Sequence, residues 1–204
     1  MQRKILRKYY SIPRYAIKVP LPDTMQKTDY SCGAAAAMAV CRYFGVGFDY
    51  EEEFIDLLKK IGMESNVGSH PYQLERVLRY FKLKYKGFSD MTIRQLKSYL
   101  RDGLPVLMMI QAYGEDDNGN PIKSYKGMTK EGHWVVAIGF DDTGIFFEDP
   151  SLEAIRGYIS YDELEERWQD TGPNEELMKH YGLIVSKPKT FPARSYARRA
   201  RHID

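Results

Sequence analysis

The sequence predicts an α+β domain in which a helical half precedes an antiparallel sheet. Three observations support this prediction. Apolar residues recur at helical spacing between residues 32 and 100, and after Gly103 the pattern changes to short runs rich in branched and aromatic residues. The segment Asp141-Asp142-Thr143-Gly144, between two of these runs, is a hairpin turn signal with Gly144 available for a positive φ. Helices followed by antiparallel strands are typical of an α+β domain rather than a doubly wound one.

The helical half begins with an alanine-rich and then apolar segment, residues 32–44. Residues 50–61 repeat the helical spacing, and Asp49 with Glu52 forms a capping pair for this second helix. A third helix is expected behind Pro71.

The fourth helix is expected after Thr92, with Gln95 in its first turn and Gly103 just past its end. One further short helix is expected after Ser160, which has Glu163 three residues later. The expected strands are Leu104–Ala112, His133–Phe140, Ile145–Asp149, Ile155–Ser160 and Tyr181–Ser186.

The composition is that of an ordinary soluble globular domain. The chain has 204 residues, enough for one domain, with 43% hydrophobic and 28% charged residues. No apolar run approaches the ~20 residues that a membrane span needs. No apolar segment follows the basic N-terminus, so a secretory signal is not predicted and the expected location is cytoplasmic.

The two ends of the chain read as additions to the domain. Residues 1–20 are expected to be an N-terminal extension, residues 21–187 the domain, and residues 188–204 a basic tail that forms an arm. Basic runs at Arg3–Lys8 and Arg194–Arg201 leave nucleic-acid contact as an alternative, but a net charge of +2 gives it little support.

The two cysteines, Cys32 and Cys41, differ in their surroundings. If both lie on one helix, their nine-residue separation gives ~13 Å of rise, too far for a disulfide. Cys41 lies on an apolar helix face and reads as a buried core residue. Cys32 lies where a polar loop becomes a helix, with Ser31 or Asp29 as N-cap, and a helix N-terminus stabilises a thiolate. The small residues after Cys32, from Gly33 to Ala37, would let a substrate backbone approach.

A histidine and an aspartate are expected to meet at one edge of the sheet. His133 opens one strand of the predicted hairpin, and Asp149 closes the next strand just before Pro150. Symmetric pairing about the turn would place His133 opposite residue 152, so a bulge or kink must close this offset.

These residue types support nucleophilic catalysis at an acyl carbon. Cys32 would be the nucleophile, His133 its base, and Asp149 the group that orients the imidazole. The backbone N–H of Cys32 and the side-chain amide of Gln26 are candidate donors to the oxyanion. The expected substrate is a peptide or protein, and no cofactor is required.

The same residues resemble a papain-like cysteine peptidase family whose best-known members remove double-glycine leaders from bacteriocin precursors. The family pattern of a glutamine, a Cys-Gly at a helix start, a Gly-His strand and an Asp-Pro after a hairpin matches Gln26, Cys32-Gly33, Gly132-His133 and Asp149-Pro150. The resemblance implies a papain-like cysteine proteinase fold with the active site between a helical lobe and the sheet. The sequence departs from the bacteriocin exporters, in which the peptidase is fused to membrane spans and an ATPase, so a stand-alone peptidase is expected and the double-glycine specificity is not carried over.

Several alternatives stay open at this point. An acyl transferase could use the same thioester, and a peptide-binding module could keep the groove without the chemistry. Residues 113–131 form a long polar insertion before His133 that would act as a flap, and its Asp116–Asn120 run reads as a hydrophilic loop rather than a calcium site. His70 and His180 fall in no recognisable motif, and without paired cysteines no metal site is expected.

Overall fold

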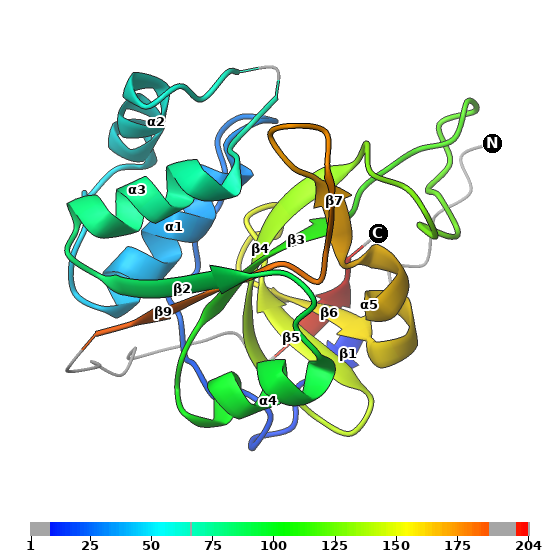
Figure 1. Ribbon diagram of the computed structural model, residues 1–204. Helices are drawn as coiled ribbons and strands as arrows, with labels where there is room; N and C mark the ends of the chain where they lie inside the picture. Colours follow the sequence, from blue (N-terminus) through cyan, green and yellow to red (C-terminus); the bar gives the residue numbers. More distant parts are fainter. Residues whose placement is uncertain (1–8, 66, 188–198, 204) are drawn as a thin grey trace.

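The computed structural model describes residues 9–65, 67–187 and 199–203, and shows a helical lobe beside a large sheet (Figure 1). Three helices form the lobe: α1 (Cys32–Tyr43), α2 (Glu51–Lys60) and α3 (Pro71–Tyr80). Helix α4 (Ile93–Arg101) and helix α5 (Tyr161–Arg167) lie outside this lobe and pack against the sheet (Figure 1). The predicted α+β class is therefore confirmed.

Helix α1 is the buried centre of the helical lobe. Every residue of this helix except Arg42 is buried, which explains why it consists largely of alanine. Gly33 allows α1 to approach its neighbours, because a Cβ atom there would lie 2.8 Å from Ser69 Cβ and 3.2 Å from the Trp134 ring. The expectation that these small residues let a substrate approach is therefore wrong. They are buried, and their small size lets α1 pack closely against neighbouring parts of the protein.

The helix boundaries follow their caps, with one correction. Thr92 Oγ1 accepts a hydrogen bond from Gln95 N at 3.2 Å, as the capping prediction requires. Gly103 follows the end of α4 with φ +74°. For α2 the predicted Asp49–Glu52 pair is wrong by one residue, because Tyr50 is the N-cap and its backbone N–H donates to Glu53 at 3.2 Å.

The sheet has eight described strands in the order β1-β10-β6-β5-β4-β3-β9-β2, and all neighbours pair antiparallel except β10 with β6. Helix α1 packs on β4, and the central strands β3 and β4 are almost entirely buried. The strands are β1 (Tyr9–Ser11), β2 (Lys84–Phe88), β3 (Val106–Gln111), β4 (Gly132–Phe140), β5 (Gly144–Glu148), β6 (Arg156–Ser160), β9 (Gly182–Ser186) and β10 (Arg199–His202). A separate two-stranded hairpin consists of β7 (Gln169–Thr171) and β8 (Leu177–Lys179).

The described parts of the two expected extensions belong to the sheet. Tyr9 pairs with Arg201 between β1 and β10, and Ile203, just after β10, is fully buried. The prediction that residues 188–204 form an arm is thus partly wrong, because backbone pairing holds residues 199–202 in the sheet. The basic run Arg3–Lys8 and residues 188–198 lie outside the described residues.

A β-bulge in β4 closes the register offset of the hairpin. Phe140 pairs with Ile145, but the register shifts between Gly139 and Ala137, so that Ala137 pairs with Phe147. The extra residue is Ile138, whose carbonyl accepts hydrogen bonds from Lys18 N and Val19 N, both at 2.9 Å. The N-terminal segment therefore pairs with the bulge.

The hairpin turn itself has a different chemistry from the prediction. Gly144 does not adopt a positive φ. The turn is instead closed by the Asp141 carboxylate, which accepts hydrogen bonds from Thr143 N at 2.7 Å and Gly144 N at 3.1 Å. Gly144 is required for close approach, since a Cβ atom would lie 2.2 Å from the Ile159 carbonyl oxygen.

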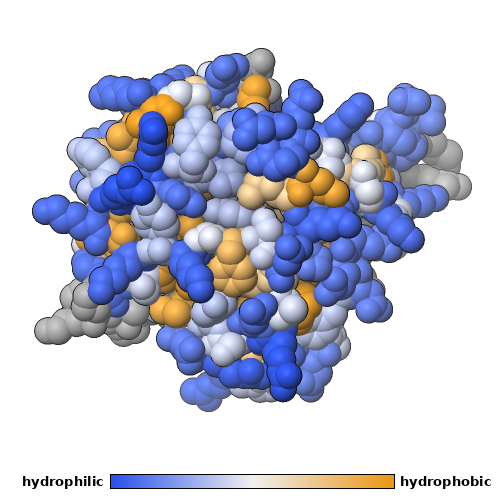
Figure 2. All heavy atoms as spheres, in the orientation of Figure 1, coloured by the Kyte–Doolittle hydropathy of each residue, from blue (hydrophilic) through white to orange (hydrophobic). Residues whose placement is uncertain are grey.

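The face in view is mainly hydrophilic, with small separate hydrophobic areas rather than one continuous patch (Figure 2). Within the described ranges, no helix combines the length and the apolar character needed to cross a bilayer.

Candidate active site

Cys32 is the first residue of α1 and is buried to 7% exposure. The loop before it is fixed by its own polar groups: Ser31 Oγ donates to Thr28 O and accepts from Thr28 N, both at 3.1 Å. Ser31 is thus the N-cap residue by position, but its hydroxyl bonds backward into the loop rather than forward into the helix. The buried carboxylate of Glu51 accepts from Lys27 N at 3.0 Å and also holds this loop.

His133 lies between Cys32 and Asp149. Its Nε2 lies 2.8 Å from Asp149 Oδ1, and Cys32 is near enough to help raise the pKa of its imidazole. Burial by itself lowers the pKa of this imidazole, but the charge and hydrogen bond of Asp149, together with the contact to Cys32, raise the pKa of His133 to about 10. The charged imidazolium is therefore the favoured form beside Cys32.

Asp149 is fully buried, and both of its carboxylate oxygens accept hydrogen bonds. Oδ1 accepts from His133 and from Ser151 N at 2.9 Å, and Oδ2 accepts from the Tyr113 hydroxyl at 2.6 Å. Burial raises the pKa of an aspartate, but the charge of His133 and these three hydrogen bonds hold the pKa of Asp149 below its usual value. Asp149 is thus a carboxylate directed at His133.

Gln26 is tied to the segment that follows Asp149. Its backbone N–H donates to Pro150 O at 2.8 Å, and its Oε1 accepts from Ser151 Oγ at 3.2 Å. Its Nε2 donates to Thr28 O at 2.9 Å. The structure therefore links Gln26 both to the loop that carries Cys32 and to the loop that carries Asp149.

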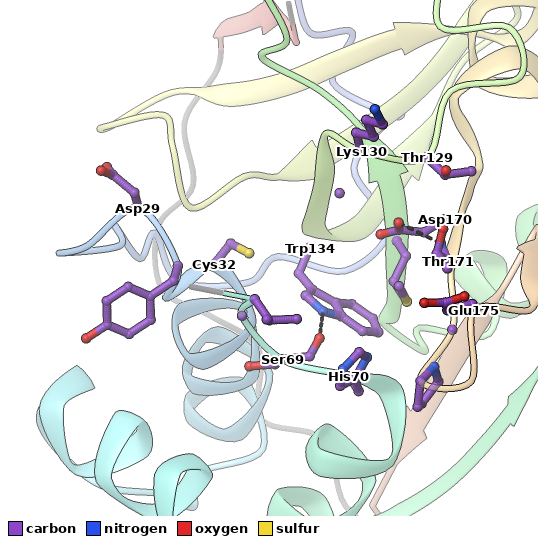
Figure 3. Close-up of a pocket in the computed structure, with 17 residues that line it drawn as sticks. Asp29, Cys32, Ser69, His70, Thr129, Lys130, Trp134, Asp170, Thr171 and Glu175 are labelled. Atoms are coloured by element: carbon purple, nitrogen blue, oxygen red, sulfur yellow. Dashed lines mark hydrogen bonds between the residues drawn. The ribbon is translucent and has the colours of Figure 1, made fainter. Parts of the chain in front are cut away.

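A cleft of about 600 Å³ opens beside Cys32 (Figure 3). Figure 3 shows Cys32 on one side of the cleft, the residues of the β7–β8 hairpin on the other, and Trp134 between them. Trp134 Nε1 donates to Ser69 O at 2.7 Å, which ties the loop before α3 to β4. The residues that line the cleft include Asp29, Cys32, His70, Lys130, Asp170 and Glu175.

Asp170 is a second buried carboxylate near the candidate catalytic residues, and no motif in the sequence indicated it. It is 9% exposed, lines the cleft from β7 and accepts a hydrogen bond from Thr171 N at 2.7 Å. Burial raises the pKa of Asp170 to about 6, against the lowering effect of that bond. Gly132 makes room for this carboxylate, since a Cβ atom there would lie 2.3 Å from Asp170 Oδ2.

A buried ion pair supports the strand that ends at Asp149. Glu148 and Arg156 are both fully buried and paired with each other. Glu148 Oε1 also accepts from Thr24 N at 2.6 Å, and the Arg156 guanidinium donates to the Leu21 carbonyl. The pair therefore connects the chain just before Gln26 to the chain just before Asp149.

The remaining cysteine and histidines have other surroundings. Cys41 is fully buried in α1 and unpaired, and burial raises the pKa of its thiol. His70 precedes α3, where its backbone N–H donates to Gln73 at 2.7 Å. His180 stacks on Trp168 with ring centroids 4.8 Å apart. Among the described residues, no group of three or more histidine, cysteine and acidic residues is placed to hold a metal ion.

The model of the Peptidase_C39 like family matches residues 17–176, which is most of the chain. The chain belongs to this family. Membership supports cysteine peptidase activity, and the match includes Cys32, His133 and Asp149. A search of curated proteins found no match.

Solved structures of C39-like peptidases have the same fold. A C39-like peptidase from Bacillus anthracis aligns with a TM-score of 0.61 at 18% identity, covering 88% of this chain and 100% of that one. A double-glycine motif protease from an AMS/PCAT transporter, solved with its leader peptide, aligns with a TM-score of 0.56 at 19% identity and covers 86% and 96%. The peptidase domain of Streptococcus ComA, a bifunctional ABC transporter of a quorum-sensing pathway, gives 0.56 at 12%, covering 85% and 98%. The predicted papain-like fold of the C39 family is therefore confirmed.

Proposed function

We propose that this C39-like chain hydrolyses peptide bonds through a thioester on Cys32, with His133 as acid and base and Asp149 as the residue that orients His133. The observation that carries the proposal is the position of His133, which bonds to Asp149 and lies near enough to Cys32 for Cys32 to help raise the pKa of the imidazole. A cysteine, a base and an orienting carboxylate in contact are the signature of an activated thiol.

The proposed reaction has two steps. The thiolate of Cys32 attacks the carbonyl carbon of the substrate, and the C–N bond breaks as His133 gives its Nδ1 proton to the leaving amine. Water then attacks the thioester, His133 accepts a proton from it, and the acid product leaves with Cys32 restored. Nε2 of His133 keeps its bond to Asp149 throughout, which fixes the ring in both steps.

The oxyanion would be held by two donors. The backbone N–H of Cys32 is one of the unbonded donors at the start of α1. Gln26 Nε2 carries two N–H groups, of which one donates to Thr28 O, so the second is proposed to reach the substrate oxygen. The anchoring of Gln26 to Pro150 and Ser151 supports this role by fixing the side chain near the other candidate residues.

The proposed substrate is a peptide held in the cleft beside Cys32. A related structure contains a leader peptide, which supports binding of an extended chain here. The double-glycine motif of that protein is not carried over to this one. We also propose that this domain acts as a stand-alone peptidase. We also propose a cytoplasmic location, which cell fractionation would test.

The proposal is tested with the purified chain and a diverse peptide library, analysed by mass spectrometry. The wild type and Cys41→Ala should both produce cleaved peptides, whereas Cys32→Ala should produce none while keeping its folded circular dichroism spectrum. A short reaction quenched in acid should show the mass of one acyl group on Cys32. Cleavage by Cys32→Ala at the wild-type rate would rule out the mechanism.

Two alternatives give different results in the same experiment. An acyl transferase would join the acyl group to an added amine in preference to water. A peptide-binding module would bind library peptides without cleaving them, and iodoacetamide would then label Cys32 no faster than the fully buried Cys41.

A further inference from the structure

Tyr113 contacts two of the residues that would act with Cys32. Its hydroxyl donates to Asp149 Oδ2 at 2.6 Å. Its ring meets His133 edge to face, with the ring centroids 5.2 Å apart and the planes at 84°. Because Asp149 Oδ1 already bonds His133 and Ser151 N, the Tyr113 bond fixes the second oxygen and with it the rotation of the carboxylate.

The backbone of Tyr113 is in an unusual conformation. Its φ of +61° lies in the left-handed region, which bulky residues rarely adopt. Such a conformation persists only where the surrounding structure determines it, and it concentrates at functional sites. On one side of Tyr113, Ala112 N donates to Glu131 O at 3.0 Å, and on the other side Gly114 N donates to the Tyr125 hydroxyl at 3.1 Å.

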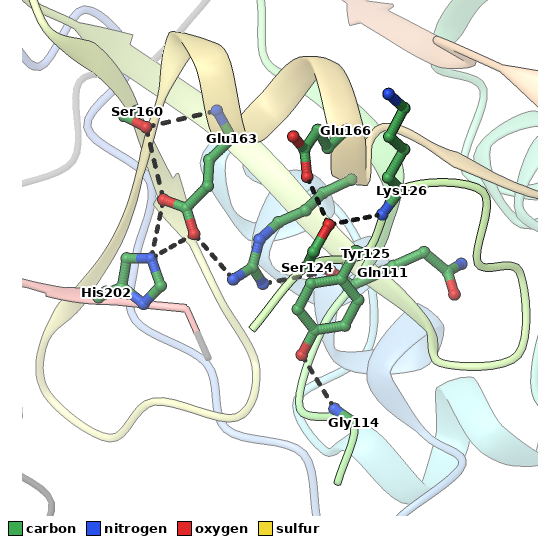
Figure 4. A network of polar contacts seen from close by, with 10 residues as sticks. Gln111, Gly114, Ser124, Tyr125, Lys126, Ser160, Glu163, Glu166 and His202 are labelled. Atoms are coloured by element: carbon green, nitrogen blue, oxygen red, sulfur yellow. Dashed lines mark hydrogen bonds and ion pairs between the residues drawn. The ribbon is translucent and has the colours of Figure 1, made fainter. Parts of the chain in front are cut away.

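A polar network outside the cleft holds Tyr125, and through it Gly114 (Figure 4). The Arg167 guanidinium lies 4.1 Å from the centre of the Tyr125 ring. Arg167 pairs with Glu163 at 2.9 Å, and Glu163 accepts from the His202 ring at 2.7 and 2.9 Å. The start of the 113–131 insertion is therefore anchored to α5 and β10, so Tyr113 reaches Asp149 from a fixed support rather than from a loose flap.

We propose that Tyr113 is a positioning residue of the active site, which holds the Asp149 carboxylate so that Oδ1 faces His133 Nε2 and limits the tilt of the imidazole with its ring edge. The inference rests on the proposed function. A tyrosine with only a packing role would need its ring but not its hydroxyl. Here the hydroxyl donates to Asp149 Oδ2, whereas His133 and Ser151 both bond Oδ1.

The test is Tyr113→Phe, which keeps the ring and removes the hydroxyl. We expect kcat to fall about tenfold, the size of one hydrogen bond to a charged group. KM should stay within about twofold, because Tyr113 does not line the cleft. Because Asp149 raises the pKa of His133, a carboxylate that turns away should shift the His133 titration to lower pH. Nitrogen-15 NMR of the four imidazoles reads this titration without any substrate.

Tyr158→Phe is the matched control. The Tyr158 hydroxyl donates to Thr143 Oγ1 at 2.9 Å beside the hairpin turn, at the other end of β4 and β5 from His133 and Asp149. Its loss should leave kcat and the His133 titration unchanged. Should Tyr113→Phe fail to fold, Tyr113→Asn takes its place, because asparagine tolerates the left-handed backbone but cannot reproduce both contacts.

The outcomes separate this inference from the proposed function. If the variant keeps wild-type kcat, or if its His133 titration stays in place or moves to higher pH, Tyr113 does not orient Asp149 and the inference is overturned. If the wild type cleaves no peptide, the proposed function fails. The NMR titration still decides the role of Tyr113 in that case, since it requires no turnover.

Discussion

His133 and Asp149 lie 2.8 Å apart, Nε2 to Oδ1, although an unbroken hairpin would place them on opposite faces of the sheet. In the register next to the turn, where Phe140 pairs with Ile145, residue 133 would pair with 152, and Asp149 would point away from it. The bulge at Ile138 moves the register by one residue. Side-chain direction alternates along a strand, so this single insertion brings Asp149 to the His133 face.

The first prediction concerns this bulge. A Cβ atom at position 139 would lie 2.3 Å from the Ala16 carbonyl oxygen, so Gly139→Ala must displace the N-terminal segment or the bulge. We expect a loss of about 1–3 kcal/mol of unfolding free energy, typical of overpacking. The variant should still be folded in the absence of urea, but its peptide turnover should fall. Urea unfolding and peptide turnover measure the two effects. The control is Gly127→Ala, where the added Cβ meets nothing within 4 Å and only the positive φ opposes it. Wild-type turnover in Gly139→Ala would contradict the role given to the bulge.

The second prediction distinguishes the role of His133 from that of Asp149. His133→Ala removes the proton carrier and should lower kcat/KM by roughly 10²–10⁴. Asp149→Asn leaves the imidazole in place with a weaker partner and should lose less. Steady-state kinetics on one peptide measure both variants. An asparagine variant that is more impaired than the alanine variant would show that Asp149 does more than orient the ring.

The third prediction concerns alkaline pH. Loss of the His133 proton removes the acid that protonates the leaving amine, so kcat should fall as the pH rises through about 10, the pKa of His133. The same proton is linked to stability. The pKa of His133 is raised on folding, so its contribution to the unfolding free energy is complete below about pH 6.5, the unfolded value. The contribution is lost as the pH rises through about 10.

The measurement is the melting temperature between about pH 8 and pH 10.5, which brackets this titration. The wild type should lose more stability over this range than His133→Gln, which has no imidazole to deprotonate. Parallel curves for the two proteins would mean that His133 does not titrate there.

The fourth prediction concerns Asp170. Burial raises the pKa of Asp170 to about 6, so its ionised form opposes folding, and this cost appears as the pH rises through that value. Asp170→Asn should therefore raise the melting temperature at about pH 8, and the difference should vanish below about pH 4, where both states bind the proton. The exposed Asp102→Asn serves as the control for the substitution itself. If Asp170→Asn is no more stable than the wild type at about pH 8, another group offsets the buried charge.

Much of the fold could be predicted because its helices and central strands bury one face or both. The segments predicted with bounds agree with α1, α2, α4, β3 to β6 and β9 to within one or two residues, and α3 and α5 begin where helices were expected. Strand β2 has no such signal, because its lysines and Gly87 lie at the open edge of the sheet. Strands β1, β7, β8 and β10 are three or four residues long and depend on pairing with distant segments.

The candidate site could be predicted where residues lie at the ends of regular elements. Cys32 opens α1, His133 follows the first residue of β4 and Asp149 follows the last residue of β5. Tyr113 and Asp170 could not be identified in the same way. Tyr113 reaches the site because of the path of an irregular insertion, and Asp170 because a hairpin with no apolar period folds against Gly132.

The antiparallel pairing of β1 with β10 also indicates that the chain could be circularly permuted. Tyr9 and Arg201 are directly opposite each other, a separation of about 5 Å between Cα atoms in such a ladder. A short glycine-rich bridge between these strands would therefore span the gap without disturbing the sheet. A circularly permuted gene, with new termini at Asp117 in the exposed tip of the insertion, should yield a folded protein whose ends emerge at that loop.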